Sequence, residues 1–341
     1  MKKSIYVVLV LIAAIAAGSI YSGDVQAETR NILIAGGRTS SPWYSMCQAL
    51  AKFINEKSTW LRAEAVSTAG ITGDVDLIKE KPQEYIGISS FSHIHYRPGH
   101  RWAEKRGTYT GDRFIANATS MSQCLVTYDP NLKTVKDLAG KVVDVGRKGA
   151  ANTPDHKAVL AKYGVADKVK YVYTGYGGGA ARLKDGLVDA TMMIFNHIYP
   201  DQFSKGGMIE KLETRRPIYY IGFDREVLLE VRDMEFATLP VRVPSGALDP
   251  KTQPEAIWAF NDPTFFMADA RMDEKVVYEV TRIIWETPPE EWAKWNPMGA
   301  HMNAKFKPAM PSLKLYRPHP GARRFYDERQ IELKDLAELL K

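Results

Sequence analysis

Beyond its first segment, the chain lacks any apolar run that approaches the ~20 residues a membrane helix needs. It also lacks a long basic run, an internal repeat, a Gly-x-Ser-x-Gly elbow and a His-Glu-x-x-His helix. These absences disfavour a nucleic-acid-binding protein and the hydrolase classes that those motifs mark. Cysteine is scarce as well, and the sequence leaves open whether Cys47 and Cys124 form a disulfide.

The first 27 residues have the pattern of a secretory signal peptide. Lys2 and Lys3 precede an apolar run over residues 5–17, and residues 25–27 offer a small-residue cleavage signature. About 13 apolar residues are too few to cross a bilayer comfortably. We expect cleavage after Ala27 and an exported, periplasmic protein, with an uncleaved anchor as the alternative.

The rest of the chain is long enough for two domains. About 314 residues exceed a single typical core, and 45% hydrophobic with 11% aromatic residues supply apolar surface for two. The formal net charge of +6 is mildly basic, and charges of both signs are interspersed, which predicts a solvated surface.

Strand-like apolar runs alternate with helical patterns, which predicts an α/β fold with mostly parallel sheets. Strands are expected over residues 31–35, 61–66, 85–89, 123–128, 141–145, 169–173 and 189–195. Helices are expected over residues 45–55, 74–79, 155–163, 180–185, 273–286 and 335–340. Five prolines in residues 239–263 are expected to break up regular structure there.

Two loops are candidates for ligand binding because each follows an expected strand and opens an expected helix. A helix N-terminus leaves N–H groups unpaired, and nearby hydroxyls or a guanidinium would add donors for an anion. The first loop contributes Arg38, Thr39, Ser40, Ser41, Trp43 and Tyr44, and the second contributes Arg147, Gly149, Asn152 and Thr153. An ordinary helix cap and a solvent-facing loop are the respective alternatives.

Two other patterns carry less chemistry. Residues 175–180 imitate a dinucleotide fingerprint, but Asp189 begins the next strand instead of ending it, so no acidic residue is placed to hold a ribose. His93, His95 and His100 form a cluster without a nearby acidic or cysteine partner before Glu104, so we expect no metal. No cofactor and no catalytic residue are predicted.

Six segments together resemble a known family of transport receptors. They are residues 36–44 leading into Ala49 and Leu50, residues 68–70 followed by residues 74–78, residues 86–89, residues 132–146, residues 183–190, and the His-Pro-Gly-Ala segment of residues 319–326. The chain is similar to the solute-binding receptors of TRAP transporters of the TAXI type, which deliver ligands to a sodium-driven membrane permease.

The resemblance implies two α/β lobes of the type II periplasmic binding protein kind, joined by hinge crossover strands, with ligand held between them. Lobe one would comprise residues 28–122 and 238–341, and lobe two residues 123–237. The chain departs from the family at the ligand loops. Ile71 and Asp74 stand where the family pattern has Ser and Asn, and residues 149–152 read Gly-Ala-Ala-Asn where it has Gly-Ser-Gly-Thr. The family's usual amino-acid or dicarboxylate ligand is therefore in doubt.

The sequence thus leads to the hypothesis of an exported receptor that closes two lobes over a small, carboxylate-bearing solute. Arg147 is the first choice for the carboxylate and Arg38 the second. The remaining candidate ligand-binding residues are Thr39, Ser40, Ser41, Trp43, Tyr44, Thr68, Gly70, Ser90, Gly149, Asn152, Thr153 and Asn196. An exported enzyme in the same cleft, or a receptor for an ATP-driven importer, is the alternative.

Overall fold

The structure is a computed structural model that describes residues 29–39, 41–150, 152–198, 202–234, 238–302, 309–310 and 316–335. Its strands are β1 (Arg30–Ala35), β2 (Leu61–Val66), β3 (Tyr85–Ser90), β4 (Asp112–Thr127), β5 (Val142–Asp144), β6 (Lys170–Val172), β7 (Ala190–Ile198), β8 (Gln202–Ser204), β9 (Tyr219–Ile221), β10 (Leu239–Val243), β11 (Ile257–Asp269), β12 (Ala309–Met310) and β13 (Lys334–Asp335).

The α-helices are α2 (Pro42–Lys57), α3 (Ile71–Glu80), α4 (Arg101–Arg106), α5 (Thr153–Lys162), α6 (Gly175–Lys184), α7 (Gly207–Glu213), α8 (Arg225–Asp233), α9 (Glu274–Glu286), α10 (Pro289–Ala293) and α11 (Pro320–Glu328). Three 3-10 helices accompany them: η1 (Phe91–Tyr96), η2 (Val135–Leu138) and η3 (Pro297–His301).

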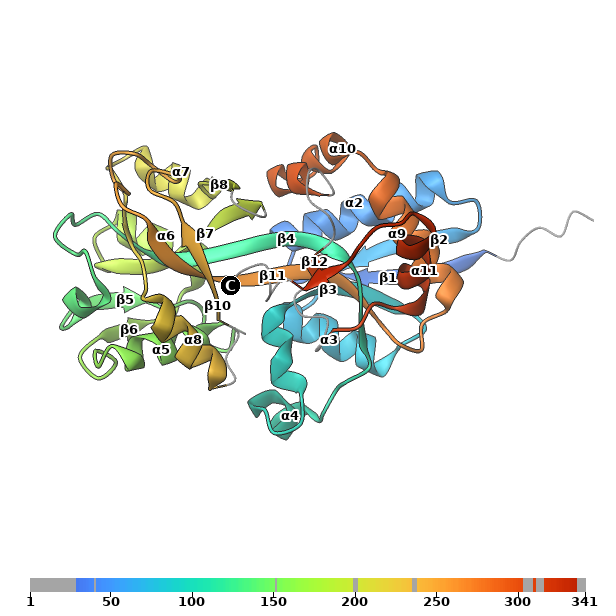
Figure 1. The fold of residues 1–341 in the computed structure, drawn as a ribbon, viewed down its shortest axis with the longest axis horizontal. Coiled ribbons are helices and arrows are strands. Elements are labelled where there is room, and N and C mark those ends of the chain that lie inside the picture. The colour runs from blue at the N-terminus through green and yellow to red at the C-terminus, as the bar shows by residue number, and fades with distance from the viewer. Residues whose placement is uncertain are drawn as a thin grey trace, which may run out of the picture. The chain divides into compact units, whose positions relative to one another are not determined.

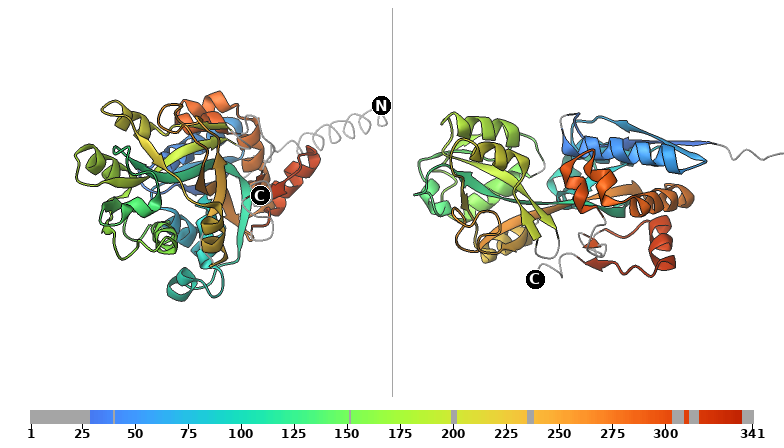
Figure 2. Two further views of the ribbon diagram at one scale, coloured as in Figure 1. Left: turned by 60° about the vertical axis from the view of Figure 1, so that its left-hand side comes forward. Right: turned by 90° about the horizontal axis from the view of Figure 1, so that it is seen from above.

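One mixed sheet holds most of the strands, in the order β2-β1-β3-β11-β4-β7-β5-β6. Strand β1 is parallel to β3, and β5 is parallel to both β6 and β7. The two longest strands, β4 and β11, lie between these parallel parts and pair antiparallel with each other and with their neighbours (Figure 1). Helices lie on both faces of the sheet (Figure 2). The predicted α/β fold with crossover strands is confirmed.

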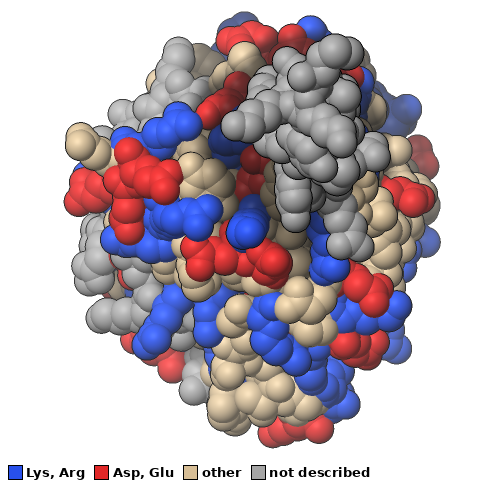
Figure 3. Space-filling view, turned by 90° about the vertical axis from the view of Figure 1, so that its right-hand side faces the viewer, with Lys and Arg blue, Asp and Glu red and all other residues tan. Residues whose placement is uncertain are grey.

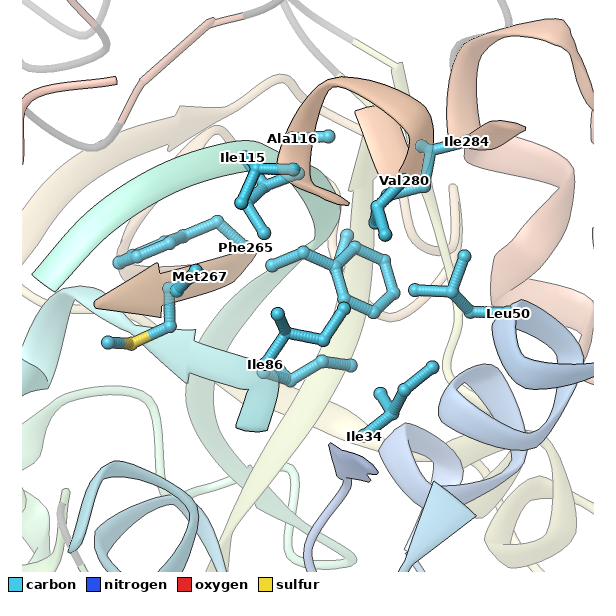
Figure 4. Packing of buried hydrophobic residues seen from close by; sticks show 14 of the residues in the cluster. Ile34, Leu50, Ile86, Ile115, Ala116, Phe265, Met267, Val280 and Ile284 are labelled. Atoms are coloured by element: carbon cyan, nitrogen blue, oxygen red, sulfur yellow. The ribbon is translucent and has the colours of Figure 1, made fainter. Parts of the chain in front are cut away.

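The buried apolar side chains form two clusters on the one sheet. The first core cluster comprises buried side chains of residues 32–118 and 265–326 together with Leu239. Figure 4 shows its packing, with Ile34, Leu50 and Phe265 from β1, α2 and β11 meeting in one interior. The second core cluster comprises buried side chains of residues 124–231 and 241–260. The lobe boundaries expected from the sequence stay a prediction.

Both long strands carry a polar stretch where they pass from one cluster to the other. On β4 the first core cluster ends at Ala118 and the second begins at Cys124. On β11 the second cluster ends at Phe260 and the first resumes at Phe265. Asn261, Asp262 and Thr264 are nevertheless buried, and Asn261 Nδ2 donates to Ser122 Oγ at 2.9 Å. The crossing is therefore held by polar contacts instead of apolar packing.

The prolines of residues 239–263 break up regular structure only in part. Pro244, Pro250 and Pro254 lie in the irregular segment 244–256, as expected. Pro240 lies in β10, which among the described strands pairs with β11 alone and so forms an edge where a missing N–H is tolerated. Pro263 lies inside β11, where the pairing with β4 shifts register directly after Thr264. The prediction was wrong at these two positions because it did not consider their place in the sheet.

Other expected elements differ mainly in extent. Strand β4 begins at Asp112 although only its last part was expected, because its central polar residues weaken the strand pattern. Helix α6 begins at Gly175, so the glycine-rich stretch lies in a helix and not in a loop. Asp335 lies in β13, and the rest of the expected final helix lies outside the described residues.

Charges of both signs lie on the surface that Figure 3 draws, and both cysteines lie in the interior. Figure 3 shows acidic and basic side chains interspersed on the face that it draws. Cys47 and Cys124 are both free and buried, the former in the first core cluster and the latter in the second. In the part of the chain that the structure describes, no helix has both the length and the apolar character to cross a membrane.

Candidate functional site

The first candidate loop connects β1 to α2 and is shaped by local capping. Ser41 is the N-cap of α2 and its Oγ accepts from the Trp43 N–H at 3.2 Å, while Pro42 occupies the first turn. Arg38 is exposed, and its Nε donates to the Ala69 carbonyl at 3.4 Å. That contact ties the loop after β1 to the loop after β2.

A buried carboxylate on α3 fixes the same two loops. Asp74 Oδ1 accepts from the Gly37 N–H at 3.0 Å and from Thr68 Oγ1 at 2.5 Å. Thr68 Oγ1 also accepts from the Gly70 N–H at 3.1 Å. Burial raises the pKa of Asp74 to about 7, although the two hydrogen bonds act in the opposite direction.

A second polar group lies at the end of β3. Ser90 is buried, and its Oγ lies 2.6 Å from Ser92 Oγ. The Ser92 N–H donates to Asp262 Oδ1 at 3.1 Å, so the end of β3 is joined to the polar crossing of β11. Burial raises the pKa of Asp262 to about 7, with a smaller contribution from the negative charge of Asp155.

The second candidate loop follows β5 and is organised by Asp144. Its Oδ1 accepts from the Gly146 N–H at 2.9 Å, and its Oδ2 accepts from the Thr174 N–H at 3.0 Å and from the Thr174 hydroxyl. Thr153 Oγ1 donates to the Arg147 carbonyl at 2.8 Å. These contacts hold the Arg147 backbone beside the start of α6.

Behind this loop, the side chains of Asn152, His156 and Tyr176 meet the side chain of Gln123 from β4 in a hydrogen-bonded network. Gln123 Oε1 lies 2.6 Å from the Tyr176 hydroxyl, 3.0 Å from His156 Nε2 and 3.3 Å from Asn152 Nδ2. Asn152 also contacts the Tyr176 hydroxyl. His156 Nδ1 lies 2.6 Å from the Val145 carbonyl oxygen. The network fixes the position of Asn152, whose side chain does not cap α5.

An ion pair connects helices α4 and α5. Arg101 Nη2 lies 3.6 Å from Asp155 Oδ1, and the Asp155 side chain is almost fully buried. Burial lowers the pKa of Arg101, and the charge of Asp155 acts in the opposite direction. This ion pair links α4 to α5 beside the Gln123 network.

A cavity of about 560 Å³ opens at this junction. Its lining includes Gly149 and Thr153 of the second candidate loop, together with three cationic side chains and one tyrosine. The complete lining is Arg101, Lys148, Gly149, Thr153, Pro154, Lys157, Ala158 and Tyr173. Gly149 has φ of +82°, a backbone conformation that favours glycine, so the loop needs glycine at this wall.

The positive charge of Arg38 in the first candidate loop acts on Arg147 in the second. The pKa of Arg147 is lowered first by burial and then by the positive charge of Arg38. Arg38 comes from the loop after β1 and Arg147 from the loop after β5, so like charges from the two halves of the sheet lie within electrostatic range. An anion between them would relieve that repulsion.

The structure brings many of the sequence-predicted residues to these strand ends, but not all of them. Thr39 is exposed in the first loop, Tyr44 lies half-buried in the first turn of α2, and Ser40 lies outside the described residues. Asn196 does not join the others. Its Nδ2 donates to Ser204 Oγ at 3.1 Å and to the Lys205 carbonyl at 3.2 Å, so it serves the β7–β8 pairing.

Sequence reasoning missed the polar residues behind the loops. Gln123 and Asp262 lie in strands, where the apolar pattern around them dominated the interpretation. His156 and Tyr176 lie in the first turns of α5 and α6. The available signal was the occurrence of amides and carboxylates inside otherwise apolar strands.

Comparison with known proteins gives a family and a fold. The model of the NMT1-like family matches residues 34–329. A solved structure of XAC2383 from Xanthomonas citri bound to ATP has a TM-score of 0.51 at 12% identity, over 88% of this chain and 99% of that chain. The periplasmic aliphatic sulphonate binding protein SsuA from Escherichia coli has a TM-score of 0.46 at 13% identity, over 92% and 97% of the two chains.

Proposed function

The chain belongs to the NMT1-like family, and from this premise we propose that it is an exported solute-binding receptor for a membrane transporter. Its two halves, lobe one (residues 28–122 and 238–341) and lobe two (residues 123–237), close over a small anionic solute. Closure is a hinge motion at the polar crossings of β4 and β11, and the ligand favours the closed form by binding it more tightly.

The observation that carries this proposal is the electrostatic effect of Arg38 on Arg147, two arginines in loops that follow β1 and β5. Arg38 and Arg147 follow β1 and β5, and the charge of Arg38 helps to lower the pKa of Arg147. Two cations held near one another are unfavourable without a counter-ion, and a guanidinium can bind a carboxylate through two parallel hydrogen bonds. Arg147, the more buried of the two, binds the carboxylate. Arg38, from the loop after β1, contacts the carboxylate when the lobes close.

Other residues of the two loops complete the binding surface. Ser41 and the first turn of α2 present N–H groups and hydroxyls, and Trp43 and Tyr44 provide apolar walls. The Trp43 indole Nε1 is buried and has no acceptor among the described residues. Asn152 of lobe two offers its side-chain amide to the solute. The ligand needs no chemical conversion in this scheme.

The partner of the receptor is a membrane permease. The resemblance to TAXI-type receptors favours a sodium-driven TRAP permease. The family model that matches the chain is a different one, so an ATP-driven importer, whose receptors share this fold, is the second candidate. Uptake by membrane vesicles loaded with the receptor distinguishes them, because the first requires a sodium gradient and the second requires ATP.

Thermal unfolding in the presence of small carboxylates, sulfonates and phosphates tests the binding proposal. A ligand at about 100 times its Kd stabilises the folded protein by roughly 2.7 kcal/mol. Arg147→Ala should remove this stabilisation. Lys184→Ala is the matched control, because Lys184 is exposed at the far end of α6 and carries the same charge.

Two outcomes would contradict the proposal. Equal stabilisation of the wild type and of Arg147→Ala by every active anion would remove Arg147 as the anchor. Chemical conversion of a stabilising solute by the purified protein would favour an exported enzyme over a receptor.

A further inference from the structure

The cavity of about 560 Å³ is separate from the proposed solute site, because neither Arg38 nor Arg147 lines it. Its wall comes from α4, from the loop after β5, from the first turns of α5 and from Tyr173, which follows β6. Arg147 and Lys148 are neighbours in the chain, but of these two only Lys148 lines the cavity. The cavity is therefore a second concave site with side chains of its own.

Cationic side chains determine the charge of the cavity wall. Arg101, Lys148 and Lys157 line it, and none of the other described lining residues is charged. The buried carboxylate of Asp155 lies 3.6 Å from Arg101 Nη2 and offsets the charge of that guanidinium. Neither Lys148 nor Lys157 forms an ion pair with a residue that the structure describes. The charges of the two lysines are thus left for a ligand.

An aromatic ring positions one of these lysines. Lys157 Nζ lies 5.0 Å from the centroid of the Tyr171 ring, and the centroids of the Tyr171 and Tyr173 rings are 6.2 Å apart. The face of an aromatic ring attracts a cation without neutralising its charge. Lys157 is therefore positioned at the wall and keeps its ammonium group for an anion.

The wall also includes the N-terminus of α5, a helix of 10 residues. Thr153 and Pro154 begin this helix and line the cavity, and the side chain of the N-cap residue Asn152 makes no capping hydrogen bond. Asp155, the acidic residue of the first turn, is paired with Arg101. The positive end of the helix dipole therefore adds to the attraction of the two lysines for an anion.

The cavity has room for more than an inorganic ion. Its volume lies within the roughly 300–1,000 Å³ that is typical of sites for small organic molecules. Pro154, Ala158 and Tyr173 give the wall an apolar and aromatic part next to the cations. The Tyr173 side chain is half-buried, so part of its surface is open to the packing of an apolar or planar group.

We propose that the cavity binds an organic phosphate monoester. Its phosphate lies at Lys148, Lys157 and the start of α5, and its organic part packs against Tyr173. A phosphate monoester carries about two negative charges at neutral pH, which match the charges of the two lysines, whereas a single carboxylate or sulfonate group carries one. Lysine binds phosphate as a point charge. The inference does not rest on the proposed function, because it uses neither Arg38 nor Arg147.

Phenyl phosphate and phenyl sulfate are matched probes, because they have nearly the same shape and differ in charge. Calorimetry at about pH 7.5, above the second phosphate pKa of about 6, should show phenyl phosphate bound at a single site in each chain. Phenyl phosphate should bind about tenfold more tightly than phenyl sulfate, as the gain of a charge-assisted hydrogen bond predicts. Equal binding of the two esters, or tighter binding of the aromatic dicarboxylate phthalate, would overturn the proposal.

Lowering the pH should weaken the binding of phenyl phosphate relative to that of phenyl sulfate. The phosphate takes up a proton near pH 6 and keeps a single negative charge below it, while the sulfate ester remains singly charged. The sulfate ester also controls for protein groups that titrate in this range, such as Asp262, whose pKa burial raises to about 7. A ratio of the two affinities that does not vary with pH would contradict a dianionic ligand.

Lys157→Met tests the lysine that the Tyr171 ring positions. This variant should bind phenyl phosphate roughly tenfold more weakly than the wild type, and Lys157→Arg should retain most of the affinity. Lys162→Met is the matched control, because Lys162 lies at the other end of α5, does not line the cavity and pairs with Glu230 at 3.0 Å. Lys157 is exposed, so its variants should fold like the wild type. Unchanged binding by Lys157→Met would overturn the proposal.

Tyr173→Ala tests the position of the organic part. The wild type should bind phenyl phosphate more tightly than methyl phosphate, because the phenyl ring packs against Tyr173. The variant should lose this preference and still bind methyl phosphate. A preference for the phenyl ester that survives in Tyr173→Ala would contradict the assigned position.

Arg147→Ala separates this inference from the proposed function. The variant should bind phenyl phosphate almost as tightly as the wild type, because Arg147 does not line the cavity. A loss as large as that of Lys157→Met would mean that both residues belong to one site, and it would overturn the inference. If phenyl phosphate binds in a manner that depends on Lys157 while no anion depends on Arg147, the inference stands and the proposed anchor fails.

Discussion

Two buried aspartates, one on α3 and one at the end of β5, each tie two loops together, but they do so differently. Asp74 on α3 uses one oxygen for two donors, Gly37 N and Thr68 Oγ1. Asp144 at the end of β5 uses both oxygens for three donors from Gly146 and Thr174. The second oxygen of Asp74 is left free to hold a proton, whereas both oxygens of Asp144 accept hydrogen bonds. We infer that the first loop pair is the adjustable one.

The largest expected effect on stability comes from removing the Asp144 carboxylate, whose two oxygens both accept hydrogen bonds. Asp144→Ala would leave three donors without their acceptor, namely the buried Gly146 N–H and the part-buried N–H and hydroxyl of Thr174. At about 1–3 kcal/mol for each donor, we expect a loss of roughly 4 kcal/mol in the free energy of unfolding. Asp74→Ala removes an acceptor of two donors and should cost about half as much. Chemical denaturation of both variants measures the ratio, and an equal or reversed loss would contradict the comparison.

The second prediction concerns pH. Burial raises the folded-state pKa of Asp74 from 3.8 to about 7. The folded protein therefore keeps a proton that the unfolded chain releases near pH 4, so stability from this group is complete below pH 4 and is lost as the pH rises toward 7. Asp74→Asn should match the wild type at pH 4 and exceed it by on the order of 3 kcal/mol at pH 8. A difference that does not vary with pH would contradict this.

The third prediction uses the glycines of the helices that carry or face these aspartates. A Cβ at Gly179 of α6 would lie 2.3 Å from Thr191 Oγ1 and 3.3 Å from Asp144 Cγ, whereas a Cβ at Gly73 of α3 would have its nearest contact at 3.3 Å, with Thr68 Cβ. Gly179→Ala should lose about 1–3 kcal/mol by overpacking. Gly73→Ala should be near neutral, because helix propensity offsets the tight contact. Thermal unfolding of the pair measures the contrast, and equal losses would contradict it.

The smallest effect is expected at the arginines in the absence of ligand. Arg147→Ala removes the repulsion with Arg38 together with some packing, so the unliganded free energy of unfolding should change by less than about 1 kcal/mol. Arg38→Ala should behave alike. A large loss in the free energy of unfolding of either variant would mean that the arginine stabilises the fold and is not reserved for binding a solute.

The sequence was sufficient for the elements that have a clean apolar period. Strand β2 was predicted to the residue, and α9 begins directly after its predicted start, where Asp273 is the N-cap. In the His-Pro-Gly-Ala segment, His319 caps α11, which is a local signal that can be recognised in the sequence. The requirement for Gly321 is non-local, because a Cβ there would lie 2.2 Å from the Glu274 carbonyl oxygen.

The crossings and the buried network were not predictable in the same way. The polar residues of β4 and β11 interrupt the apolar pattern because these segments pack against neither cluster, so they were interpreted as loop or proline-broken structure. The role of Gln123 depends on Asn152, His156 and Tyr176, which lie 29 to 53 residues away from it in the sequence. A contact of that kind leaves no period in the sequence.

The most direct test of the account is a titration of wild-type protein and of Arg147→Ala with the same panel of small anions, followed by thermal unfolding. The account predicts that at least one anion raises the Tm of the wild type and leaves that of Arg147→Ala unchanged. A panel in which no anion distinguishes the two proteins would contradict the claim that Arg38 and Arg147 form an anion site.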